Sequence, residues 1–380
     1  WAIYIVVGLA LCYFAYRRGF PLALRSAFYP LLGERIYRWP GDVIDTLAIV
    51  GTLFGVATSL GIGAIQISGG VGYLTGDTWS LTGRILLIAG ITAVATISVI
   101  LGIQRGIRRL SLINISLAGV LLGFVFVVGP TVFILNGLAQ NIGYYLQSLP
   151  QMSLRTDLFA GDQWQATWTL FYWGWWISWS PFVGMFIARI SRGRTVREFV
   201  AGVLLVPTLV TFVFLTVLGQ AAFDSELRGP GGIVAATEER AENALFALLD
   251  QYPLALVTSV IAVVVIATFF VTSSDSGSLV DDIHASGGSL RPNRVTRVFW
   301  ALVEGAVAAT LLAIGGQSGL DALQQASIAS GVPLAILLLG ACWALVSAFR
   351  REEREGGIPV DTSVPRQRGE QEPSGDRTPG

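Results

Sequence analysis

The sequence contains no lysine, one histidine and two cysteines among its 380 residues. Cys12 and Cys342 both lie inside apolar runs, which excludes a disulfide framework and a cysteine metal site. The single histidine, His284, excludes metal binding or proton relay by paired histidines, and we expect it in a polar loop. The formal net charge is zero, so nothing favours a nucleic-acid partner.

Charge is also scarce, because only 13% of the residues are charged while 53% are hydrophobic. A soluble domain carries about 25% charged residues. A soluble core stops growing at roughly 250–300 residues, so a larger core cannot absorb this apolar excess. The composition therefore predicts an integral membrane protein surrounded by a lipid bilayer. The chain opens on Trp1 within an apolar run, and we expect it to be truncated at its N-terminus.

The apolar runs predict an all-α fold with nine transmembrane helices. A hydrocarbon core of about 30 Å is crossed by roughly 20 apolar helical residues. The runs are continuous, whereas the strands of a membrane β-barrel alternate. They cover 1–16, 43–66, 83–103, 112–136, 166–188, 198–219, 253–274, 298–316 and 331–349. This defines a membrane domain at 1–349, followed by a tail at 350–380 whose Gly, Pro, Arg and Glu content predicts disorder.

The arginines predict the orientation of these helices. Of the 25 arginines, 21 lie in the tail or in the connections after the first, third, fifth and seventh runs. Positive charge marks the cytoplasmic side, so we expect a cytoplasmic C-terminus. On the opposite side, residues 137–165 have the spacing of a surface helix, and residues 220–252 form an acidic loop with a Gly-Pro-Gly-Gly turn at 229–232.

A tryptophan-rich run reads FYWGWWISWSPFVGMF over residues 171–186. Its tryptophans lie in the middle of a predicted span, whereas an interfacial aromatic belt lies at helix ends. Trp179 shares a helix face with Trp175 and with Trp176. Ring faces attract a quaternary ammonium group, so a ligand box is favoured over plain packing. Pro181 and Gly184 follow and should weaken the helix there.

Hydroxyl and small residues gather in two further runs. In residues 267–278, Thr272 and Ser273 offer oxygen ligands for a small cation, although packing and capping explain such residues equally well. Asp275 in the same run is expected to be a cap or the partner of a loop arginine. Residues 51–63 repeat small side chains at spacings that let helices approach closely, and Thr52 there presents an oxygen inward.

Glu304 lies about seven residues into a predicted span, where a carboxylate is costly. Pairing with a loop arginine near the cytoplasmic face is favoured over a role in coupling.

These runs together resemble the betaine/carnitine/choline transporter family. The resemblance lies in residues 172–199, 52–63, 128–132 and 269–276, and it extends over 1–349. It implies a secondary transporter with twelve helices, ten of them in two inverted five-helix repeats, of which this chain holds the last nine. It also implies a plasma-membrane location and a possible homotrimer.

The same resemblance implies the site residues. The substrate box would comprise Trp1 and Tyr4 from one helix and Trp175, Trp176 and Trp179 from another. One sodium site would use the Phe269 carbonyl with the hydroxyls of Thr272 and Ser273. A second would use Thr52 and a hydroxyl one turn later, where this chain has Val56 and departs from the family.

The implied function is sodium-coupled symport of a quaternary-ammonium solute, with glycine betaine favoured. It involves no covalent chemistry, so the chain is not expected to be an enzyme or to need a cofactor beyond the coupling ion. Two alternatives stay open: a choline or carnitine carrier or antiporter of the same family, and a sensor or channel that does not transport.

Overall fold

The computed structural model describes residues 1–101, 104–156, 158–159, 161, 164–289, 293–315 and 320–354. Every regular element within these ranges is helical, which confirms the predicted all-α class. By length and composition, seven of the described helices can cross a membrane. They are α3 (Trp39–Thr75), α4 (Leu81–Leu101), α5 (Gln104–Val128), α9 (Val196–Arg228), α12 (Ala255–Ala285), α13 (Arg294–Ile314) and α14 (Asp321–Arg354).

Two shorter apolar helical segments correspond to the other predicted spans. The first runs over Ala2–Arg17 and consists of α1 (Ala2–Cys12) and the π-helix η1 (Tyr13–Arg17). The second is divided into the π-helix η4 (Gln165–Phe171), α7 (Tyr172–Ser178) and α8 (Ser180–Ile190). All nine predicted apolar runs are therefore helical where the structure describes them, although their bounds differ.

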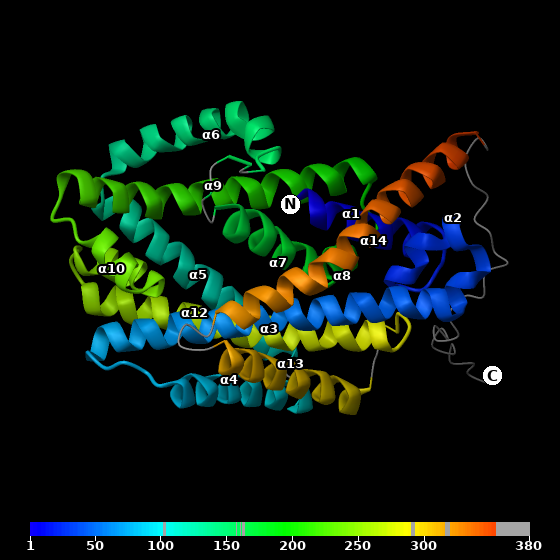
Figure 1. Cartoon of the computed structure of the whole chain (residues 1–380), viewed down its shortest axis with the longest axis horizontal. Coiled ribbons are helices and arrows are strands. Elements are labelled where there is room, and N and C mark those ends of the chain that lie inside the picture. Colours follow the sequence, from blue (N-terminus) through cyan, green and yellow to red (C-terminus); the bar gives the residue numbers. More distant parts are fainter. Residues whose placement is uncertain are drawn as a thin grey trace, which may run out of the picture.

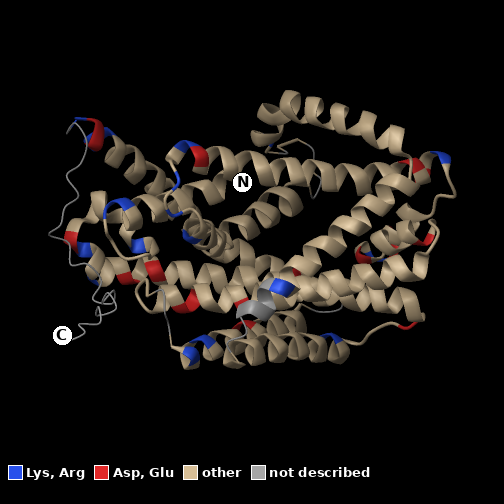
Figure 2. Cartoon of the chain, turned by 180° about the vertical axis from the view of Figure 1, so that it is seen from behind, with Lys and Arg blue, Asp and Glu red and all other residues tan. Residues whose placement is uncertain are grey.

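Helices α3 and α12 lie side by side in the middle of the molecule (Figure 1). Helices α13 and α4 pack together on one side of this pair, and α14 crosses α3 diagonally. On the other side, α9 packs against α5 and α6 (Thr131–Ser153), and α1 packs against α8. Charged residues gather toward the two ends of the long helices and leave most of the middle without charge (Figure 2).

Small side chains allow α3 and α12 to approach closely. A Cβ atom added at Gly63 would lie 2.1 Å from the ring of Phe270, and one added at Gly277 would lie 3.0 Å from Val56. These two contacts give the antiparallel register of the pair. The packing role predicted for the small residues of 51–63 is confirmed, since Gly51, Gly55 and Gly61 also contact neighbouring helices.

The predicted span at 112–136 is wrong at its C-terminal end. Helix α5 ends at Val128, because Pro130 has no backbone N–H with which to continue it. The Thr131 hydroxyl donates instead to the Phe126 carbonyl, at 2.7 Å, and α6 begins at Thr131. Helix α6 contains most of the surface helix predicted at 137–165, and it lies at the edge of the molecule beside α9 (Figure 1).

The acidic loop predicted at 220–252 is mostly helical. Helix α9 continues to Arg228, and the Gly-Pro-Gly-Gly turn leads into α10 (Ile233–Glu239), η5 (Ala241–Asn243) and α11 (Ala244–Asp250). Phe246, Leu248 and Leu249 are buried, so this connection packs as part of the bundle. At the other end of α9, Thr195 and Glu198 form a capping box.

Helix α12 extends eleven residues beyond its predicted end at 274, to Ala285. His284 therefore lies in its last turn and is only 1% exposed, so the prediction of a loop histidine is wrong. Helix α14 likewise continues to Arg354, which makes the start of the predicted tail helical. The rest of that tail lies outside the described residues.

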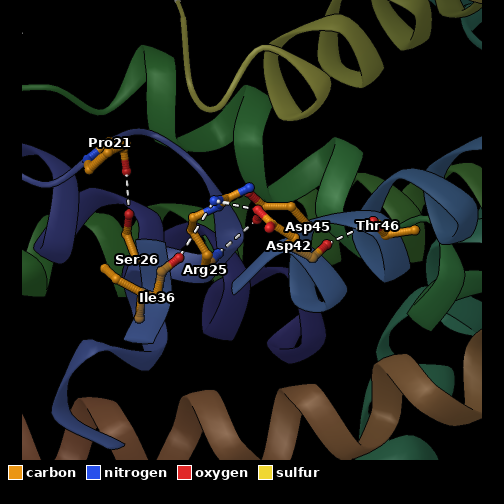
Figure 3. Close-up of polar contacts among 7 residues, drawn as sticks. All are labelled: Pro21, Arg25, Ser26, Ile36, Asp42, Asp45 and Thr46. Carbon is orange, nitrogen blue, oxygen red and sulfur yellow. Dashed lines mark hydrogen bonds and ion pairs between the residues drawn. The ribbon is translucent and has the colours of Figure 1, made fainter. Parts of the chain in front are cut away.

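The connection between α1 and α3 is fastened to the start of α3 by Arg25 of η2 (Leu24–Phe28) (Figure 3). The Arg25 guanidinium pairs with the buried carboxylate of Asp45 and lies 3.0 Å from that of Asp42. The backbone N–H of Arg25 also donates to Asp45, at 2.9 Å. The remaining elements of this connection are α2 (Tyr29–Leu32) and η3 (Gly33–Tyr37).

Candidate functional site

The tryptophan-rich helix is interrupted in the middle of the molecule. Helix α7 ends at Ser178, and α8 begins at Ser180 with Pro181 in its first turn, so that Trp179 lies at the junction. Pro181 lacks the N–H that an unbroken helix would need there. The weakening predicted around Pro181 is therefore present, and it places aromatic side chains on both sides of the break.

Three rings predicted to bind substrate form one cluster. Trp1 and Tyr4 of the α1 segment meet Trp176 of α7. The Tyr4 and Trp176 rings stack with centroids 5.2 Å apart. The Trp1 ring meets Tyr4 and Trp176 edge-on, with centroids 5.3 Å and 5.7 Å away. Two helices distant in sequence are thus joined by edge-on and stacked aromatic rings.

Two polar atoms of this cluster, and one of the neighbouring Trp179, lack partners within the described part of the chain. The Trp1 indole N–H, the Tyr4 hydroxyl and the Trp179 indole N–H are buried without a hydrogen bond there. A buried donor left unsatisfied costs roughly 1–3 kcal/mol. Tyr4 is only 1% exposed. These three groups are therefore buried donors whose hydrogen bonds are not made within the described residues.

Trp175 and Trp179 form a second, adjoining group that faces α3. Their rings stack with centroids 6.4 Å apart. The Trp175 indole N–H lies 3.3 Å from both the Gly55 carbonyl and the Ser59 hydroxyl. Gly55 makes this approach possible, because a Cβ atom there would lie 3.1 Å from the Trp179 backbone. The five predicted residues therefore form two groups, and the Trp175 indole is engaged in helix packing.

Tyr172 joins the two groups and was missed by the sequence analysis as a site residue. Its ring stacks on Trp176 with centroids 5.7 Å apart and meets Trp175 edge-on at 6.2 Å. Its position three and four residues before these tryptophans was the available signal. Trp173 of the same run is 54% exposed and makes none of the ring contacts described for the two groups.

The predicted ligands of the first sodium site lie on one helix, α12. The Thr272 hydroxyl donates to the carbonyls of Thr268 and Phe269, at 3.1 Å and 2.9 Å. The Phe269 carbonyl assigned to the cation therefore accepts a hydrogen bond from its predicted co-ligand. Ser273 is half-buried next to them. Phe269 itself is 44% exposed, so its ring takes no part in a closed site.

Thr52 lies elsewhere, on α3. Its hydroxyl is fully buried and has no hydrogen-bond partner within the described ranges. The register of α3 and α12 places it about 12 Å along the helix axis from the level of Ser273. The residues predicted for the two cation sites therefore lie apart on α3 and α12. Val56 packs against Gly277 and offers no oxygen to the second site.

The predictions for two acidic residues have different outcomes. Asp275 pairs with Arg297, with 3.0 Å between Oδ2 and Nη2, which confirms an arginine partner. Glu304 is fully buried and accepts a hydrogen bond from Ser274, at 3.3 Å, so the arginine pairing favoured for it is absent among the described ion pairs. Asp281, also fully buried, was missed because the predicted span ended before it.

A bundle of long apolar helices with a broken, aromatic-rich helix at its centre is the architecture of a multi-pass membrane protein. The family model for betaine/carnitine/choline family transporters matches residues 1–354. The chain belongs to this family, as the resemblance implied.

Three relatives illustrate the similarity. An uncharacterized transporter of Mycobacterium tuberculosis is 51% identical over 92% of this chain and 59% of its own length. A glycine betaine/proline/choline transporter of Vibrio parahaemolyticus is 45% identical over 93% of this chain and 63% of its own. A glycine betaine transporter of Bacillus subtilis is 42% identical over 93% and 69%. The chain thus spans roughly three fifths of the first of these relatives.

Proposed function

We propose that this chain forms the larger part of a secondary transporter for a quaternary-ammonium solute, with glycine betaine favoured and sodium as the coupling ion. The observation that carries the proposal is the cluster of Trp1, Tyr4 and Trp176, whose ring faces suit a trimethylammonium group. The unpartnered hydroxyl and indole N–H groups beside it suit a carboxylate. A zwitterion such as betaine has both parts.

The proposed mechanism is alternating access. Solute and sodium bind together from outside, and the helix bundle then rocks to open toward the cytoplasm. We also propose that the protein has the family's inverted repeats, a cytoplasmic C-terminus, a plasma-membrane location and a trimeric assembly. A choline carrier of the same family is the second candidate, favoured by the relative whose name includes choline.

The test uses the complete protein in proteoliposomes and measures uptake of labelled glycine betaine. Trp176→Leu should raise the half-saturation concentration by about one to two orders of magnitude. A lost ring face removes about 0.5–2 kcal/mol of cation attraction, and 1.4 kcal/mol is about tenfold in affinity. Trp176→Phe should be milder because it keeps an aromatic face. Trp173→Leu is the matched control, because Trp173 belongs to the same helix but is 54% exposed and lies outside the described ring contacts.

An isostere of betaine with carbon in place of nitrogen separates cation attraction from packing. It should bind the wild type poorly and lose little further affinity in Trp176→Leu. If the isostere suffers as much as betaine, or if Trp173→Leu is as harmful as Trp176→Leu, the ring cluster is a packing feature and the proposal fails.

The sodium assignment is tested in the same vesicles. Replacing Thr272 and Ser273 together with Ala should weaken the sodium dependence of uptake more than the affinity for solute at saturating sodium. Replacing Thr208 and Thr211 of α9 with Ala is the control, since both hydroxyls also bond carbonyls of their own helix. Wild-type uptake that ignores sodium would refute the assignment.

A further inference from the structure

Glu304 of α13 lies among apolar residues of a membrane-spanning helix and is fully buried. Its Oε2 atom accepts a hydrogen bond from the Ser274 hydroxyl of α12 at 3.3 Å. Its Oε1 atom has no hydrogen-bond partner in the part of the chain that the structure describes. A Cβ atom at Gly277 would lie 3.0 Å from both Oε1 and the Val56 side chain, so α12 and α3 close tightly around this carboxyl group.

A second buried carboxyl group lies on the same face of α12. Asp281 follows Ser274 by seven residues and Gly277 by four, spacings that share a helix face. It is fully buried, and neither of its carboxyl oxygens has a hydrogen-bond partner among the described residues. Glu304 contacts α12 at Gly277, about one turn before Asp281 on the same helix face.

The groups around this pair do not neutralise it. The charged groups that interact with Glu304 are Asp275 and Asp281 of α12 and Arg297 of α13 itself. Arg297 is already engaged by Asp275, through its carboxylate at 3.0 Å and its carbonyl at 3.1 Å. Asp282 adds a further acidic neighbour to Asp281. The other packed helices contribute uncharged side chains, Val56 from α3 and Thr92 from α4 against Gly305.

An isolated buried carboxylate is so costly that the group takes up a proton or a cation instead. Two carboxyl groups that share a site cannot both ionise readily. Among the described residues, no group of three or more His, Cys, Asp and Glu side chains could hold a metal ion. A proton neutralises a carboxylate without needing any further oxygen ligands.

We propose that Glu304 and Asp281 form a proton-binding pair inside the membrane part of the bundle, and that solute transport requires this pair to be protonated. The requirement for protonation during transport rests on the proposed function, whereas the proton-binding pair itself does not. The packing of α13 against α12 and α3 holds the neutral pair. Because α12 also carries the proposed sodium ligands, loss of the proton disturbs the helix that binds the coupling ion.

Infrared spectroscopy of the complete protein tests the pair without any transport assay. A protonated carboxylic acid has a C=O stretching band that a carboxylate lacks. The wild type should show a buried acid band at neutral pH, and Glu304→Gln and Asp281→Asn should each reduce or remove it. Glu352→Gln is the matched control, because Glu352 already accepts a hydrogen bond from Tyr13 and pairs with Arg17.

Folding is an independent readout. Gln has the shape of protonated Glu, so Glu304→Gln should melt close to the wild type. Three results would contradict a protonated pair: no acid band in the wild type, a full band in both variants, or a Glu304→Gln variant that does not fold. Each of these is expected if the carboxyl groups are ionised and paired instead.

The pH dependence of uptake tests the second half of the proposal. At saturating sodium, wild-type uptake should fall as pH rises through the titration of the pair, because the protonated form is the active one. The double variant Glu304→Gln/Asp281→Asn has no carboxyl group left to ionise in the pair and should remove that decline. A decline that persists in the double variant would overturn the requirement for protonation. A protein that shows the band but transports no quaternary-ammonium solute would instead refute the proposed function.

Discussion

Helices α3 and α9 are both long enough and apolar enough to cross a membrane, but they meet different surroundings. The most apolar 18-residue window has a mean hydropathy of 1.9 in α3 and 2.4 in α9. In α3, 72% of that window is buried, compared with 11% in α9. Hydropathy alone therefore does not show which helix is central and which faces lipid.

The size of the side chains does distinguish them. Helix α3 carries Gly51, Gly55 and Gly63 against neighbouring helices, together with buried hydroxyls such as that of Thr58. Helix α9 has large aliphatic residues in the corresponding stretch, and many of them are exposed. Within lipid, helices associate through close packing and interhelical hydrogen bonds, which small and hydroxyl side chains permit. The same kind of substitution should therefore have different effects in the two helices.

Removing an arginine should give the largest difference in unfolding free energy between the two helices. Arg25→Gln leaves the Asp45 carboxylate of α3 buried without its partner, and such a change costs about 3–5 kcal/mol of unfolding free energy. Arg228→Gln removes the exposed partner of Asp224 at the end of α9 and should cost less than about 1 kcal/mol. Unfolding in mixed detergent measures both, and equal losses would contradict the comparison.

Adding one methyl group should change the unfolding free energy by an intermediate amount, lowering it in α3 and raising it in α9. Gly55→Ala in α3 places a Cβ atom 3.1 Å from the Trp179 backbone and should destabilise the protein by about 1–3 kcal/mol. At Gly219 in α9 nothing lies within 4 Å of such an atom. Gly219→Ala should therefore stabilise its helix by about 0.5–1 kcal/mol. Thermal unfolding reports the signs, and a stabilising Gly55→Ala would show that α3 is less tightly packed than described.

Removing a hydroxyl should give the smallest contrast. The Thr58 hydroxyl of α3 lies 2.8 Å from that of Ser327 in α14, and its loss in Thr58→Val should cost about 0.6 kcal/mol. The Thr211 hydroxyl of α9 bonds only the Pro207 carbonyl of its own helix in the described structure. Thr211→Val should leave the unfolding free energy unchanged. A double variant with Ser327→Ala should add nothing to Thr58→Val if the two hydroxyls bond each other.

The helical class and the close packing of α3 were predictable because length, hydropathy and small-residue spacing are local properties. The polar end of α12 was not. Asp281 and His284 lower the hydropathy of that segment, so it was interpreted as a loop, although neighbouring helices bury it. The extension of α9 to Arg228 was missed for the same reason. A helix that continues as a polar but buried element cannot be distinguished from a loop by hydropathy.

The candidate site was predictable only in part. The helical spacing of Trp175, Trp176 and Trp179 was visible in the sequence, but the contribution of Trp1 and Tyr4 depended on the family resemblance. Which tryptophan faces α1 and which faces α3 depends on the rotation of the broken helix, and that rotation is set by packing around Gly55. Such long-range geometry leaves no periodic signal.

The Arg25–Asp45 ion pair links α1 to α3. Tyr4 near the start of α1 contacts the ring cluster, and the connection that follows α1 is held to the start of α3 by Arg25. Helix α1, which carries two rings of the cluster, and the start of α3 are therefore tied through one short connection and the Arg25–Asp45 ion pair. The position of the first turns of α3 thus depends on the position of the helix that carries Trp1 and Tyr4.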